Sequence, residues 1–168
     1  MKHKRSETPA YLIWVEQRPS NKGKGKQTYF AAVKQASQTQ IDRPITAHDI
    51  EVEIIYSTTV RKGERMDTDN IIKPTLDALK GVTYTDDSQV RSAIVTLFDR
   101  NQPATVSGRV EHMGRLFYSN NPHVVLIMIY SDSRLQELGG EKEVQGRRYL
   151  EWQRSFDQML SRVKKGSA

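Results

Sequence analysis

The chain has 168 residues, no cysteine and a formal net charge of +6. This length fits one domain with a modest core, and the absence of cysteine excludes disulfides and thiolate metal sites. The basic excess favours an anionic partner, of which nucleic acid is the commonest. Because we find no signal peptide and no apolar run that could cross a membrane, we expect a cytoplasmic protein with no membrane partner.

The N-terminal part predicts a basic tail, a strand and a basic loop. Residues 1–9 carry little to bury, so they are either a solvated tail or a contact with DNA backbone. The apolar run Tyr11–Val15 predicts a buried strand. Residues 20–26 (SNKGKGK) predict a flexible loop without the ending of a nucleotide-binding P-loop. The loop is either simply solvated or a DNA contact, and its candidate residues are Lys22, Lys24 and Lys26.

A helix over residues 27–39 and a half-buried strand over Ile50–Tyr56 are predicted next, the strand from its alternating apolar residues. That strand leads through a basic turn into an acidic segment. The basic residues near this turn are further candidates for phosphate contacts: Arg61, Lys62 and Arg65.

The acidic segment places Asp67 and Asp69 two residues apart, just before a predicted helix. Proline fits the first turn of a helix best, so Pro74 predicts a start near residue 70 or 71, with Asn70 as a cap. On an extended segment, residues two apart point to the same side, so we expect both carboxylates to face one cavity.

The predicted helix ends at Lys80-Gly81, and an apolar stripe of Ile72, Leu76 and Leu79 is expected along it. Residues 82–84 favour an extended return. Such a return would carry Asp86 and Asp87 back towards the first acidic pair.

Converging carboxylates require a cation, since two unit charges ~4 Å apart repel by about 4 kcal/mol at an effective dielectric near 20. Oxygen ligands with open positions suit Mg²⁺, which Mn²⁺ can replace, and Lys73 is placed to contact a phosphate oxygen. An Asp-x-Asp-Asn string alone is more often a solvated turn or a helix cap. The calcium-loop alternative is excluded, because Ile71 and Ile72 stand where that loop needs an oxygen ligand and a glycine.

In order and spacing, these residues resemble the signature of the RusA-like Holliday junction resolvases. The resemblance is dense from residue 67 to residue 90, and Arg18-Pro19-Ser20-Asn21 resembles the family's proline-rich entry. The matching residues are Asp67-x-Asp69-Asn70, Lys73, Leu76-Asp77-Ala78-Leu79, Gly81 and Asp86-Asp87-Ser88-Gln89.

The resemblance implies that Asp67, Asp69 and Asp87 bind the metal and that Lys73 is the catalytic lysine. It also implies a homodimer that acts on four-way DNA junctions. The supporting candidates for the site are Asn70, Asp77 and Asp86.

The remainder predicts a strand over Val90–Phe98, a loop or hairpin over residues 99–121 and a central strand over Val124–Tyr130. After Gly139-Gly140, apolar residues recur at spacings of three and four and predict an amphipathic helix. Its apolar stripe suits packing on its own domain or a dimer seam, and comprises Tyr149, Trp152, Phe156, Met159 and Val163.

We therefore expect an α+β domain with a mixed, mostly antiparallel sheet of four or five strands, covering helices and a C-terminal helix. The expected divisions are a mobile tail at 1–9, an endonuclease domain at 10–132 and a helical extension at 133–168. The expected function is metal-dependent resolution of four-way junctions in DNA recombination and repair. The alternatives are a nuclease for flaps or forks, a branched-DNA-binding module without catalysis, and an acidic-metal domain within a larger assembly.

Overall fold

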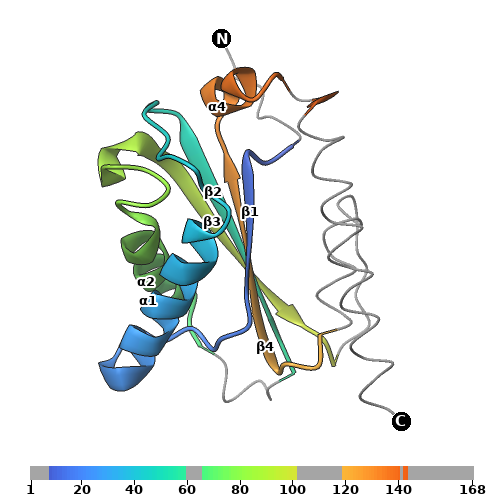
Figure 1. Cartoon of the computed structure of the whole chain (residues 1–168). Helices are drawn as coiled ribbons and strands as arrows, with labels where there is room; N and C mark the ends of the chain where they lie inside the picture. The colour runs from blue at the N-terminus through green and yellow to red at the C-terminus, as the bar shows by residue number, and fades with distance from the viewer. Residues whose placement is uncertain (1–7, 60–65, 102–118, 141, 144–168) are drawn as a thin grey trace.

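A computed structural model of the chain describes residues 8–59, 66–101, 119–140 and 142–143. Four strands within these ranges form one sheet in the order β1-β4-β2-β3 (Figure 1). Their bounds are β1 Tyr11–Val15, β2 Ile50–Thr58, β3 Val90–Asp99 and β4 His123–Tyr130. β4 is antiparallel to both β1 and β2, whereas β3 is parallel to β2. The predicted fold class, α+β with a mixed, mostly antiparallel sheet, is confirmed.

The strands arise where the sequence alternates or is continuously apolar. β1 has the burial pattern of a strand with one side on the core, since Tyr11, Ile13 and Val15 are buried. β4 is central and buried on both faces, as its unbroken apolar run predicts. Alternate β4 residues Val125, Ile127 and Ile129 belong to the main core. The residues between them pack in a second cluster with Ile55 on the opposite side of the sheet.

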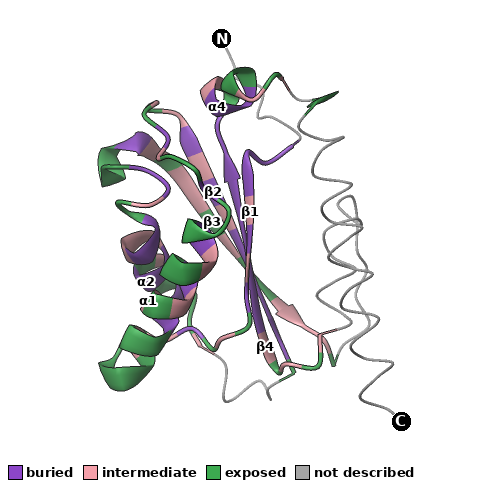
Figure 2. Cartoon of the chain, viewed as in Figure 1, coloured by how far each residue is buried: buried purple, intermediate pink, exposed green. Residues whose placement is uncertain are grey.

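Two helices, α1 (Gly23–Gln38) and α2 (Asp69–Leu79), lie side by side against one face of the sheet (Figure 1). Tyr29 and Val33 of α1 and Ile71 of α2 complete the main core there. Figure 2 shows exposed residues on the outer side of α1 and buried residues along the central strands. At the α1–α2 contact, the Tyr29 hydroxyl lies 2.7 Å from the Thr75 hydroxyl, and both side chains are buried.

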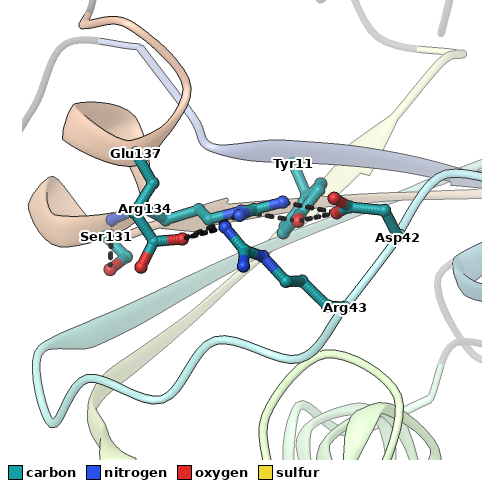
Figure 3. A network of polar contacts seen from close by, with 6 residues as sticks. All are labelled: Tyr11, Asp42, Arg43, Ser131, Arg134 and Glu137. Carbon is teal, nitrogen blue, oxygen red and sulfur yellow. Dashed lines mark hydrogen bonds and ion pairs between the residues drawn. The ribbon is translucent and has the colours of Figure 1, made fainter.

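A short helix, α4 (Asp132–Glu137), follows β4 and is fastened to β1 by Arg134. The Arg134 guanidinium is buried, donates to the Tyr11 hydroxyl and pairs with Asp42 and Glu137 (Figure 3). Leu135 belongs to the main core. The predicted domain boundary at residue 132 therefore falls at the start of a helix that packs on the sheet.

Several predictions lie outside the described residues: most of the tail predicted over residues 1–9, the turn with Arg61, Lys62 and Arg65, and most of the 99–121 loop. Thr8 and Pro9, the two described residues of that tail, are buried. The amphipathic stripe from Tyr149 to Val163 is outside them as well. Among the residues that are described, no helix has the length and apolar character needed to cross a membrane.

Candidate active site

Asp67 and Asp69 lie at the N-terminal end of α2, and both are exposed. Thr68 already has helical dihedral angles (φ −56°, ψ −38°), and Asp69 is the first helical residue. The prediction that both aspartates precede the helix, on the incoming strand or loop, is therefore wrong for Asp69, whereas Asp67 does precede the helix. Their place at the helix start has its own physical reason, because the positive end of a helix favours carboxylates.

The early start puts Pro74 in the second turn, so the prediction of a first-turn proline is also wrong. A proline there removes the hydrogen bond that its N–H would donate to the carbonyl of Asn70, four residues earlier. The buried face of α2 is rotated relative to the predicted apolar stripe. Ile71, Thr75 and Ala78 are buried, while Ile72 is only half-buried.

Asn70 does not cap α2, contrary to prediction, because it lies inside the helix. Its side-chain oxygen accepts a hydrogen bond from the side-chain amide of Asn21. Asn21 belongs to the Arg18-Pro19-Ser20-Asn21 turn, which precedes α1. This contact brings the beginning of α1 next to the acidic end of α2, although 49 residues separate the two asparagines.

The predicted basic loop over residues 20–26 is mostly helical, since α1 begins at Gly23. Lys22 occupies the N-cap position, and Lys22 and Lys24 are exposed. The Lys26 ammonium lies 3.8 Å from a carboxylate oxygen of Asp77 on α2. Lys24 and Lys26 therefore sit on the helix that borders α2, and Lys22 immediately precedes it.

Lys73 is exposed and lies four residues after Asp69 and four before Asp77. Residues four apart share one face of a helix. Asp69, Lys73 and Asp77 thus form a polar row along α2, and the predicted proximity of Lys73 to the first acidic pair follows from this spacing.

Asp86 and Asp87 lie beyond the other end of α2. Lys80 and Gly81 end that helix as predicted, with Gly81 at φ +79°, a conformation that favours glycine. Residues 81–83 form a turn, and Asp87 begins a short 3-10 helix, η2 (Asp87–Gln89). The predicted extended return over residues 82–84 is therefore wrong for residues 82 and 83, whereas Tyr84 forms a β-bridge with Ile45.

A lysine from the end of α2 holds this second acidic pair. The Lys80 ammonium is 3.0 Å from a carboxylate oxygen of Asp87 and 3.7 Å from one of Asp86. The hydrogen bond with Asp87 raises the pKa of Lys80 above its usual value. The backbone N–H of Ser88 donates to Asp86 and lowers the pKa of that carboxyl.

The two acidic pairs do not converge within the chain. α2 has 11 residues, so its ends are about 16 Å apart at 1.5 Å per residue. The parallel register explains the separation: Val90, just after η2, pairs with Ile50 at the start of β2, whereas Asp67 follows the end of β2. Within the described ranges, no three His, Asp or Glu side chains form a group that could hold a metal. The carboxylates of Asp67, Asp69 and Asp87 are donors that suit Mg²⁺. Within one chain, however, the three do not lie close enough together to bind the same ion.

Sequence reasoning missed the contacts of Asn21, Lys80 and Gln89. Asn21 and Gln89 stand within the motifs that carried the resemblance, but no pattern revealed what they bind. Gln89 is only 2% exposed and fastens η2 to the segment before β2. For Lys80, the sequence predicts only a helix end.

A further basic group lies where β4 begins, which sequence reasoning also missed. Burial, Arg18 and Arg100 together lower the pKa of His123, whose Nδ1 is 2.8 Å from the Tyr56 hydroxyl. Arg100 donates to the backbone carbonyl of Ser119. These residues lie at the end of the sheet where β2 finishes and the chain continues towards the acidic segment.

Comparison with known proteins gives one family. Residues 15–127 match the sequence model of a family described as endodeoxyribonuclease RusA. The match runs from the last residue of β1 to the middle of β4 and includes both acidic pairs. No curated protein matches the chain.

Proposed function

Because the chain belongs to the RusA family of endodeoxyribonucleases, we propose that it resolves four-way (Holliday) DNA junctions by hydrolysing phosphodiester bonds in recombination and repair. The family match over residues 15–127 carries this proposal. The net charge of +6 supports it, since a basic protein attracts the phosphate backbone.

The ligands proposed for Mg²⁺, or Mn²⁺ in its place, are Asp67, Asp69 and Asp87. All three are exposed, and carboxylate oxygens are the donors these cations prefer. A cation bound there would acidify a water molecule and stabilise the charge that develops on phosphorus. Lys73, on the same face of α2 as Asp69, neutralises a non-bridging oxygen or the leaving group.

The distance along α2 supports a site shared between two subunits. Asp67 and Asp69 lie at one end of α2 and Asp87 beyond the other, so no single described subunit supplies all three carboxylates. In the proposed homodimer, Asp67 and Asp69 meet Asp87 of the partner subunit. A two-fold dimer then has two equivalent sites, as two equivalent strands of a junction require.

The proposed DNA contacts extend from the acidic end of α2. Lys24 and Lys26 lie on α1, and Lys22 immediately precedes it. The start of α1 is joined to this end of α2 through Asn21 and Asn70. Phosphate contacts of this kind position the junction without reading its sequence. The proposed contacts outside the described residues are Arg61, Lys62 and Arg65. Asn70, Asp77 and Asp86 support the site through the contacts already described.

The test compares cleavage of a mobile four-way junction with cleavage of a linear duplex of the same sequence. Each is incubated with Mg²⁺, Mn²⁺ or EDTA at two salt concentrations, because phosphate-dominated binding falls by roughly 10³–10⁵ between 50 and 200 mM salt. The proposal predicts paired, symmetric, metal-dependent nicks confined to the junction. Faster cleavage of flaps or forks than of the junction would favour the broader nuclease. Tight binding with no cleavage would favour a binding module.

A further inference from the structure

The buried side chain of Gln89 lies at the centre of a polar network beside Asp87. Its Oε1 accepts from the backbone N–H groups of Thr85 (2.8 Å) and Asp86 (2.9 Å) and from the Thr85 hydroxyl (2.7 Å). Its Nε2 donates to the carbonyl of Ile45 (2.8 Å) and to that of Ala47 (2.9 Å). The side-chain amide thus uses both donors and accepts three hydrogen bonds.

Only an amide of this length satisfies the network. Glutamate has no donor for the two carbonyls, and asparagine is one carbon too short to reach the same groups. A buried polar network fixes one arrangement when every member is satisfied, and loses that property when one partner is missing. Gln89 is therefore suited to hold a backbone segment in a single position.

The segment that Gln89 holds includes Asp87. Asp86 caps η2 by accepting from the backbone N–H of Ser88, at 2.9 Å, while Gln89 accepts from the backbone N–H of Asp86 in return. Asp87 lies between Asp86 and Gln89, the two residues that these hydrogen bonds hold in place. A backbone hydrogen bond also joins the segment before β2 to the segment before η2: the Ile45 N–H donates to the Thr83 carbonyl at 2.7 Å.

We propose that Gln89 is a positioning residue of the catalytic centre: its amide fixes the direction in which Asp87 presents its carboxylate to the divalent cation. The inference rests on the proposed function, because it assigns Asp87 the role of a ligand. Gln89 itself is buried and touches neither substrate nor cation. It acts by joining the Asp86-Asp87 turn to the segment that precedes β2.

The test uses Gln89→Glu, which keeps the acceptor and removes both donors, with Gln89→Asn as a second variant should the first not fold. Tyr29→Phe is the matched control, because it removes the buried hydrogen bond with Thr75 without touching the Asp87 turn. Thermal unfolding first establishes that each variant is folded. Mn²⁺ binding is then measured directly by electron paramagnetic resonance, junction binding is measured in EDTA, and cleavage is measured as a function of Mn²⁺ concentration.

Gln89→Glu is expected to weaken Mn²⁺ binding by about 10- to 100-fold, as loss of a group that orients a metal ligand does. Junction affinity in EDTA should remain within about twofold of wild type, because no DNA contact is removed. Mn²⁺ binding and cleavage equal to those of Tyr29→Phe would overturn the positioning role.

Failure of the proposed function would look different. Wild-type protein would then neither bind Mn²⁺ nor cut the junction. The positioning role would in that case be decided by amide hydrogen exchange at Asp86 and Ser88. Gln89→Glu should accelerate this exchange at least tenfold relative to Tyr29→Phe, and equal rates would overturn the role.

Discussion

The Lys80 ammonium lies 3.0 Å from a carboxylate oxygen of Asp87. This pair joins the C-terminal end of α2 to η2, and Asp86 approaches the same ammonium at 3.7 Å. Lys80 thus places a positive charge beside the carboxylate that we assign to the metal. A divalent cation bound to Asp87 must share that carboxylate with Lys80 or displace the lysine.

Lys80→Met should therefore increase the affinity for Mn²⁺, by roughly two- to fivefold, because exposed ion pairs contribute little. Lys80→Arg keeps the charge and serves as the control, with an affinity near that of wild type. Calorimetric titration with Mn²⁺ measures both. Weaker binding by Lys80→Met would mean that the lysine orients Asp87 instead of competing for it.

Asp67→Asn should keep junction binding, with the same or higher affinity, because it removes negative charge facing DNA. Cleavage should fall by at least about 100-fold, since losing a metal ligand costs no less than losing a residue that supports one. Gel-shift binding in EDTA and single-turnover cleavage in Mg²⁺ give the two values. Retained metal-dependent cleavage would remove Asp67 from its proposed role.

Lys24→Gln should weaken junction binding equally for all sequences and reduce the slope of log affinity against log salt by about 1. Lys34→Gln is the control, because Lys34 is also exposed on α1 but is more than two turns farther along the helix. Binding isotherms at four salt concentrations supply both slopes. Equal slopes for the two variants would place the DNA elsewhere.

The contacts of the Asp42 carboxylate (Figure 3) predict that part of the free energy of unfolding is lost at acid pH. The loss of some hydration beside its neighbours opposes its ionisation, but hydrogen bonds from Arg134 and Tyr11 outweigh this effect and lower the pKa of Asp42 below 3.8. The unfolded chain thus binds more protons between the folded pKa and 3.8. The stabilisation from Asp42 is complete above 3.8 and is lost as pH falls through the folded pKa.

Asp42→Asn should lower the free energy of unfolding at pH 7 by about 1 kcal/mol, a charged hydrogen bond discounted for solvent exposure. The difference from wild type should shrink as pH falls below 3.8. Urea unfolding at pH 7, 4 and 3 measures it. A difference that stays constant with pH would show that the charge of Asp42 is not what stabilises α4.

The four strands could be predicted because alternation and continuous apolar runs report burial directly. The start of α1 could not be predicted, because two glycines with interspersed lysines, from Gly23 to Lys26, are typical of a flexible loop. The structure gives Gly25 a packing reason: an added Cβ would lie 2.7 Å from the Ser20 hydroxyl oxygen. Such close approach between turn and helix leaves no periodic signal in the sequence.

The sequence suggests candidate residues for the site but does not reveal how they are arranged. The aspartates are recognisable from their spacing, whereas the distance between Asp69 and Asp87 depends on strand pairing. Because β2 and β3 are parallel, α2 must carry the chain back before β3 begins. Local sequence does not state whether two strands pair in parallel, so the predicted convergence failed.

The most direct measurement mixes two inactive variants, Asp69→Asn and Asp87→Asn, so that their subunits form mixed dimers. If each site combines Asp69 of one subunit with Asp87 of the partner subunit, a mixed dimer has one intact site. Random pairing should then restore about a quarter of the wild-type sites and give single nicks in the junction. A mixture as inactive as either variant alone, beside an active wild-type protein, would contradict a site shared between subunits.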